Sequence, residues 1–145
     1  ESYLPLGLTQ YNKAISQVKD HILVEHLDWL RKLPIYYETD KYFFVHAGVL
    51  PNFSLQDHKD GLNGKGFKED PYNNPDWWKQ QMIWIRDQFI NSNFDWGKKI
   101  IYGHTVTTMP NIDNNKIGID GMFHNVGQLV ALELPDERFY YEKSS

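Results

Sequence analysis

Apolar residues in this 145-residue chain gather in short runs that are separated by polar stretches. Five of these runs have the length and the aromatic or β-branched content of strands, and they occupy residues 42–45, 99–102, 116–119, 128–134 and 138–142. The turn Thr39–Lys41 joins the first run to residues 35–38, which predicts a β-hairpin. A second turn is expected at Pro135–Glu137, between the last two strands.

Two further segments show helical spacing instead. Apolar positions recur at helical intervals from residue 9 to residue 33, which predicts either one helix or two helices with a break near Asp20. A later helix is expected to begin at Asn74 or Asp76 and to end near Asn91. The polar and glycine-rich residues 52–74 before it predict a long surface loop, and such loops are often functional.

The order of these elements, with helices first and then strands interrupted by one helix, predicts a mixed α/β fold of the α+β type. Helices should cover one side of the sheet, with few parallel crossovers. The length of 145 residues fits a single domain with a substantial core.

Composition narrows the function classes. The balance of 15 Lys+Arg against 19 Asp+Glu gives no basic surface for nucleic acid. No apolar run approaches the roughly 20 residues of a membrane span. The absence of cysteine agrees with a cytoplasmic location and leaves only nitrogen and oxygen ligands for any metal, which suits Mn, Fe, Zn or Mg.

Two histidines at strand ends carry the candidate chemistry. His46 follows the apolar run 42–45, and His104 follows the run 99–102, each with a glycine close by. A rigid strand that ends in an imidazole beside a sharp turn is well suited to present a metal ligand. Each histidine taken alone is equally compatible with a hydrogen-bonded core position. Asp120 ends a third such run and either orients a histidine or caps a turn.

These segments also resemble a known family. The chain is similar to the C-terminal half of the bacterial calcineurin-like metallophosphoesterases, and most similar to the serine/threonine phosphatases of the phosphoprotein phosphatase type. The matching segments are Phe44–Pro51, Ile101–Thr105, Ile117–Gly121 and Gly127–Leu134, supported by His26–Tyr37 and Ile83–Phe89. The resemblance implies that residues 1–145 are the C-terminal part of one metallophosphoesterase domain, a two-sheet β-sandwich flanked by helices.

The resemblance further implies a function. His46 and His104 would be ligands of the second of two divalent ions, with manganese, iron, zinc or magnesium as candidates. Arg86, in the later helix, would bind phosphate oxygens; the alternative for it is a helix-surface arginine paired with a nearby carboxylate. The activity implied is hydrolysis of phosphate monoesters by a water activated between the two metals, in a phosphorylated protein or a small phosphate ester. The alternatives are a diadenosine-tetraphosphate hydrolase and a non-catalytic interaction domain.

The other motifs of that family, Asp-X-His, Gly-Asp-X-X-Asp-Arg-Gly and Gly-Asn-His-Glu, do not occur in this sequence. We therefore expect the chain alone to be inactive and to represent a piece of a longer protein. We also expect a face of the sheet with Phe43, Val45, Ile100 and Tyr102 to lack its cover, so that the missing half or a second copy would bind there.

The remaining candidates are weaker. His21 and His26 are expected on a helix, His58 in the polar loop and His124 in a turn near Asp120. The many aromatic residues, including Trp77, Trp78, Trp84 and Trp96, are interpreted first as core packing, with an exposed patch for a partner as the alternative.

Overall fold

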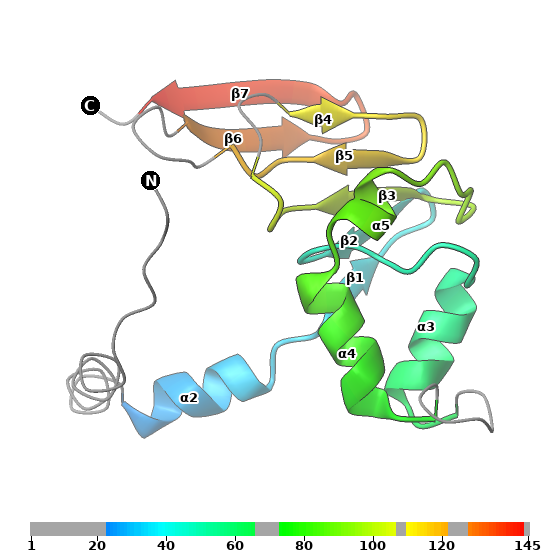
Figure 1. Cartoon of the computed structure of the whole chain (residues 1–145). Coiled ribbons are helices and arrows are strands. Elements are labelled where there is room, and N and C mark those ends of the chain that lie inside the picture. The colour runs from blue at the N-terminus through cyan, green and yellow to red at the C-terminus, as the bar shows by residue number, and fades with distance from the viewer. Residues whose placement is uncertain (1–22, 66–72, 107–109, 122–127, 144–145) are drawn as a thin grey trace, which may run out of the picture. The chain divides into compact units, whose positions relative to one another are not determined.

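The computed structural model describes residues 23–65, 73–106, 110–121 and 128–143 (Figure 1). The chain divides into two compact units, residues 1–34 and residues 35–145, and each is described by itself. In the first unit, α2 (Val24–Arg31) ends shortly before Pro34, as the helical pattern predicts. The earlier part of that predicted helical segment lies outside the described residues.

The second unit is built on a five-stranded sheet with the strand order β1-β2-β3-β5-β4. Its strands are β1 (Tyr36–Glu38), β2 (Tyr42–Val45), β3 (Lys99–Tyr102), β4 (Asn111–Ile112) and β5 (Lys116–Gly118). β1 and β2 form the predicted antiparallel hairpin, whereas β2, β3 and β5 run parallel to one another. The carboxyl ends of these three strands therefore lie at one edge of the sheet.

The last two strands form a separate hairpin. β6 (Gln128–Glu133) and β7 (Arg138–Lys143) pair in antiparallel fashion, which confirms the predicted strands and the turn between them. Lys99 Nζ lies 2.6 Å from Glu137 Oε1 in this turn, and the Tyr42 hydroxyl donates a hydrogen bond to the Pro135 carbonyl. The predicted α+β class is confirmed, whereas the two-sheet sandwich stays a prediction. The short strand β4 was not predicted.

The prediction of a loop over residues 52–74 is wrong, because α3 (Leu55–Leu62) lies within it. Ser54 caps this helix by accepting a hydrogen bond from the Asp57 backbone, and the Asp57 carboxylate accepts one from the Ser54 backbone in return. His58 lies in α3 and is completely buried. Its Nε2 accepts a hydrogen bond from Leu50 N–H, and its Nδ1 lies 2.7 Å from the Ser54 carbonyl.

The later helix begins where predicted but ends early. Asn74 caps α4 (Pro75–Trp84), and proline occupies the first turn, where its missing N–H is harmless. A break at Ile85 and Arg86 then separates α4 from the short helix α5 (Asp87–Ile90). Arg86 has the non-helical dihedral angles φ −131° and ψ −105°, so it belongs to a connection and not to the middle of a helix.

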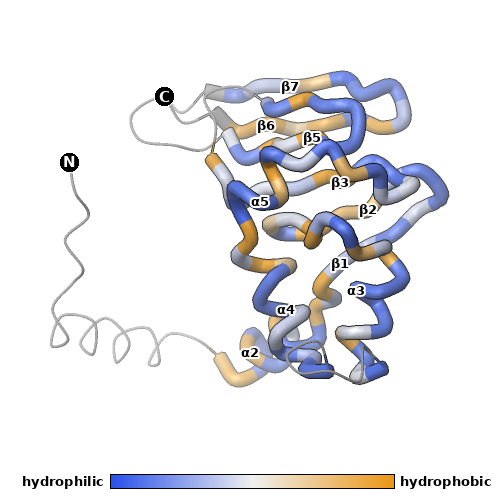
Figure 2. Tube along the Cα trace, turned by 45° about the vertical axis from the view of Figure 1, so that its right-hand side comes forward, coloured by the Kyte–Doolittle hydropathy of each residue, from blue (hydrophilic) through white to orange (hydrophobic). Residues whose placement is uncertain are grey.

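The expectation of an uncovered sheet face is wrong. Phe43, Val45, Ile100 and Tyr102 are all buried, and they share one core cluster with residues of α3, α4 and α5. The helical members of this cluster include Leu55 of α3, Trp78 and Met82 of α4, and Phe89 of α5. Figure 2 shows the apolar positions of the strands and helices of this unit in orange. The chain's own helices thus supply the cover that was expected from a partner.

Acid should weaken this core through His58. Burial lowers the pKa of the His58 imidazole below its usual 6.5, and the Ser54 hydrogen bond and the Asp57 charge oppose this shift. As the pH falls, His58 is protonated in the unfolded chain before it is protonated in the folded protein. The contribution of His58 to the free energy of unfolding is therefore at its full value above about pH 6.5 and decreases as the pH drops below it. This one group contributes a slope of at most about 1.4 kcal/mol per pH unit.

Urea unfolding of the wild type and of His58→Gln between about pH 5 and pH 7.5 measures this slope. We expect a shallower pH dependence in the variant. The same slope in both proteins would show that His58 does not carry the effect.

Candidate metal centre

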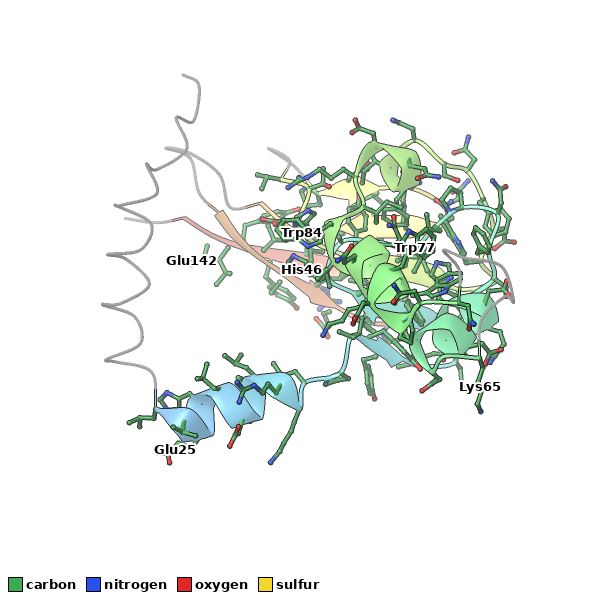
Figure 3. The ribbon with its side chains drawn as sticks, turned by 60° about the horizontal axis from the view of Figure 1, so that its bottom comes forward. Glu25, His46, Lys65, Trp77, Trp84 and Glu142 are labelled. Atoms are coloured by element: carbon green, nitrogen blue, oxygen red, sulfur yellow. The ribbon has the colours of Figure 1, made fainter. Side chains whose placement is uncertain are left out.

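The parallel sheet brings the two strand-end histidines together. His46 directly follows β2, and His104 follows β3 after Gly103. The Gly103 N–H donates a hydrogen bond of 2.8 Å to the His46 carbonyl, which ties the two strand ends to each other. As a result, the centroids of the two imidazole rings lie 5.0 Å apart. Figure 3 labels His46 and, on α4, Trp84.

His104 has an unusual backbone conformation. Its φ of +64° lies in the left-handed region, which costs a residue other than glycine about 1–2 kcal/mol. Arg86 supports this conformation, because its Nη1 donates a hydrogen bond of 3.0 Å to the His104 carbonyl. The break between α4 and α5 is what brings Arg86 to this position.

The imidazole of His104 is held by its surroundings on one side and lacks a partner on the other. Its ring meets the Trp84 indole at nearly a right angle, with the ring centroids 5.4 Å apart. Its Nε2 atom is buried without a hydrogen-bond partner in the described part of the chain, and so is Oγ1 of Thr105. A buried nitrogen without a partner is costly unless a ligand completes it.

The surroundings of His104 favour the neutral form of its imidazole. Burial lowers the pKa of the His104 imidazole, and the nearby charges of Arg86 and His46 lower it further. A hydrogen bond to the Trp84 backbone and the Asp120 carboxylate act in the opposite direction but are weaker. The neutral imidazole is the form that binds a metal ion.

These observations fit a divalent ion held between the two histidines. An ion about 2.1 Å from one nitrogen of each imidazole, at a near-tetrahedral angle, places the ring centroids roughly 5 Å apart. The observed separation of the two ring centroids is 5.0 Å. The Nε2 atom of His104, which has no hydrogen-bond partner among the described residues, would be available to coordinate the ion. Within the described residues, however, no group of three or more His, Asp or Glu is arranged to hold a metal. The two histidines alone do not make up such a group.

Asp120 follows β5 at the same edge of the sheet. A Cβ atom placed on Gly103 would lie 3.7 Å from the Asp120 Cβ and 3.6 Å from the His46 carbonyl. The aspartate therefore lies next to the link between the two histidine strands. Its carboxylate raises the pKa of His104, and the Gly121 N–H closes the adjacent turn on the Ile119 carbonyl.

The other candidates have different positions. Arg86 is exposed, and the guanidinium that was expected to bind phosphate oxygens uses Nη1 on the His104 carbonyl. His58 is a core residue and His26 is exposed on α2, while His21 and His124 lie outside the described residues. Trp84, interpreted as core packing, is instead 66% exposed.

Trp84 is the residue of the site that the sequence interpretation missed. The sequence signal that could have identified Trp84 is its position two residues before Arg86, because one short segment then contributes both side chains to the site.

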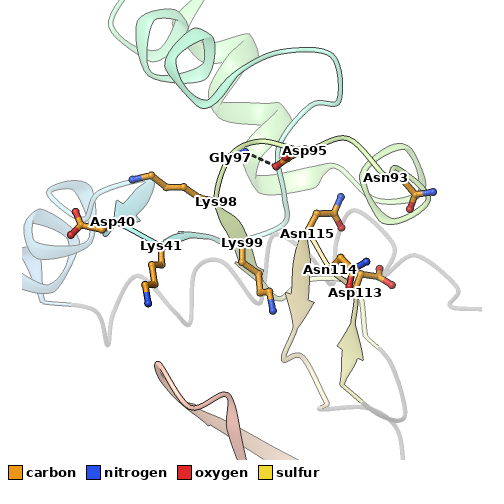
Figure 4. A pocket seen from close by; sticks show the side chains of 10 residues that line it. All are labelled: Asp40, Lys41, Asn93, Asp95, Gly97, Lys98, Lys99, Asp113, Asn114 and Asn115. Carbon is orange, nitrogen blue, oxygen red and sulfur yellow. Dashed lines mark hydrogen bonds between the residues drawn. The ribbon is translucent and has the colours of Figure 1, made fainter.

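A polar hollow of about 630 Å³ lies elsewhere on the second unit (Figure 4). It is lined by residues at the amino ends of β2, β3 and β5, among them Lys98 before β3 and Lys99 at its start. Both lysines are paired, Lys98 with Glu38 at 2.9 Å and Lys99 with Glu137 at 2.6 Å. Because the hollow lies at the amino ends of the parallel strands and the histidines lie at the carboxyl ends, it is not part of the candidate metal centre.

Comparison with known proteins finds a short match. A segment of 30 residues is 50% identical to the symmetrical bis(5'-nucleosyl)-tetraphosphatase of Nitrosomonas europaea. The match covers 21% of this chain and 11% of that protein. No protein-family model matches the chain. This segment supports a relationship to the metallophosphoesterases and an origin among the hydrolases.

None of the helices in the described ranges has the length and the hydrophobicity that crossing a bilayer requires.

Proposed function

We propose that this chain is the C-terminal part of a metal-dependent phosphoesterase and that His46 and His104 are ligands of one divalent ion. The observation that supports this proposal most strongly is the buried Nε2 atom of His104. It has no hydrogen-bond partner among the described residues, and its ring lies 5.0 Å from that of His46. The short match to a tetraphosphatase agrees with the same class of chemistry.

In this proposal the residues of the chain have separate tasks. The two imidazoles hold the ion, and Arg86 fixes the His104 backbone through Nη1. Within the described residues, the exposed Arg86 guanidinium has N–H groups beyond the Nη1 bond, and these would bind phosphate oxygens. A divalent ion supplies Lewis-acid polarisation of a phosphate oxygen and lowers the pKa of a water molecule. The remaining ligands and the acid that protonates the leaving group come from outside this chain, since the family's other motifs do not occur here.

The substrate proposed first is a phosphorylated serine or threonine of a protein, as the resemblance of the histidine segments implies. A dinucleoside tetraphosphate is the second candidate, and the named activity of the matching protein favours it. Assays of the full-length protein with Mn²⁺ on a phosphoserine peptide and on diadenosine tetraphosphate would decide between the two substrates.

Metal titration of the 145-residue chain tests the site directly. Imidazole suits Zn²⁺ and Co²⁺, so we expect one weakly bound Co²⁺ or Zn²⁺ ion in isothermal titration calorimetry. His46→Ala and His104→Ala should each weaken binding by more than about 10-fold, because each removes one of two ligands.

The matched control is His26→Ala, which removes an exposed histidine of α2. It should leave the metal affinity unchanged. Binding that survives either strand-end substitution, or that disappears equally in the control, would contradict the proposed metal centre.

A further inference from the structure

The strand β7 has one edge that no other described strand covers. Within the described residues β7 pairs with β6 alone, and the two strands form a sheet of their own. The backbone N–H and C=O groups of a strand point alternately to its two sides, so about half of those of β7 point away from β6. An open edge of six residues can serve as a template for another strand.

The side chains of β7 alternate between charged and aromatic positions in an ordered way. Arg138, Tyr140 and Glu142 lie on one face of the hairpin, and all three are exposed. Phe139 and Tyr141 lie on the opposite face, with ring centroids 6.3 Å apart and ring planes only 19° from parallel. One face therefore presents a basic, an aromatic and an acidic residue in sequence.

This order is complementary to itself in one antiparallel register. When Tyr140 lies opposite Tyr140 of a second copy, Arg138 lies opposite Glu142 of that copy, and the two-fold axis repeats the pair. In the same register Phe139 lies opposite Tyr141 of the second copy. Opposite charges and aromatic rings directly across from one another are the cross-strand pairs that stabilise antiparallel sheets.

The neighbouring registers lack this match. A shift of one residue in one direction places Arg138 opposite Lys143 of the second copy, where two like charges meet. A shift in the other direction places Arg138 opposite Tyr141, so that its charge has no opposite charge across from it. Either shift also brings unlike faces of the two hairpins to the same side of the joined sheet.

We propose that β7 is the contact surface of a homodimer, in which it pairs in antiparallel fashion with β7 of a second copy. The partner is a second copy because the order of charged and aromatic residues in β7 complements itself. An interface made of one strand edge is small, so we expect a weak dimer with a dissociation constant of roughly 10–100 µM. The proposal does not depend on the candidate metal centre.

Sedimentation velocity of the 145-residue chain from about 1 µM to about 500 µM measures the association. The wild type should show a monomer–dimer equilibrium. Glu142→Arg should weaken the dimer by more than about 10-fold, because both charge pairs become pairs of like charge. Adding Arg138→Glu to this variant should restore the affinity to within about 3-fold of the wild type, since both pairs return with their signs exchanged.

The matched control is Glu25→Arg, which makes the same change of charge at an exposed position of α2. It should dimerise like the wild type.

A cysteine substitution tests the register directly. The chain contains no cysteine, so Tyr140→Cys introduces a single thiol. In the proposed dimer the two Cβ atoms at this position lie roughly 4.5–5.5 Å apart, and mild oxidation should link the copies through a disulfide. Tyr37→Cys, which replaces a tyrosine of β1 that is 65% exposed, should not give this product.

Four results would overturn the proposal. The first is a monomer at every concentration, and the second is a dimer that Glu142→Arg leaves intact, since another surface would then join the copies. The third is a failure of the double variant to restore the dimer. The fourth is an absence of cross-linking in Tyr140→Cys in a sample that dimerises.

Discussion

Replacement of Trp78 by alanine is expected to lower the free energy of unfolding by about 3–5 kcal/mol. Trp78 is completely buried and joins α4 to α3. Its indole packs edge to face on Phe53 and His58, with centroids 5.4 and 5.1 Å away. Gly61 of α3 makes room for this ring, because a Cβ atom there would lie 2.2 Å from the indole nitrogen. Truncation would leave a large cavity between two helices.

Urea unfolding followed by circular dichroism measures the effect of Trp78→Ala. Trp84→Ala is the matched control, since it removes the same side chain from an exposed position of the same helix. The control should lose at most about 1 kcal/mol. Similar losses in the two variants would contradict the packing of α4 described here.

Gly48→Ala is expected to be the other strongly destabilising change, with a loss of about 3 kcal/mol or more. A Cβ atom on Gly48 would lie 2.4 Å from the Phe89 ring, and Phe89 is completely buried. The backbone at Gly48 also has a φ of +157°, which L-residues rarely adopt. Because Gly48 lies two residues after His46, the strain should also reduce metal binding.

Gly97→Ala separates the two causes. Gly97 has a φ of +76°, and a Cβ atom there would meet nothing within 4 Å. This control therefore reports the backbone cost alone, about 1–2 kcal/mol. If thermal unfolding gave the same loss for both glycines, the contact with Phe89 would contribute nothing.

The strands were largely predictable because their signal is local. The hairpin of β1 and β2, the runs that form β3 and β5, and the terminal hairpin all follow from short apolar segments bounded by turn residues. The strand β4 escaped notice because it has only the residues Asn111 and Ile112 and pairs solely with β5 in the described structure.

The helices were harder to predict, for two different reasons. The glycine, aspartate and lysine residues of α3 are typical of loops, so the helix was not predicted. Its start is nevertheless marked by the capping residues Ser54 and Asp57, three residues apart. The break after α4 contains no proline or glycine from which it could have been predicted. Tertiary contacts decide it instead, since the Met82 carbonyl accepts a hydrogen bond from Ala47 N–H and Arg86 binds the His104 carbonyl.

The candidate site was predictable only in part. The sequence places His46 and His104 at strand ends, and parallel pairing then determines that they meet. The position of the Trp84 ring and the buried nitrogen of His104 depend on how the end of α4 meets the residues that follow β3, which no local pattern encodes. The prediction of an uncovered sheet face at Phe43 and Ile100 was wrong for the same reason, because the positions of the covering helices cannot be read from local sequence.

The hydrogen bond from Gly103 N–H to the His46 carbonyl joins main chain to main chain. The spacing of the two donors is consequently a property of the sheet register, and neither imidazole is needed to maintain it. One position can then be exchanged while the other stays in place. In the proposed metal centre, His46→Asp and His46→Glu would present an oxygen ligand opposite an unmoved His104, so that its metal preference would be adjustable one ligand at a time.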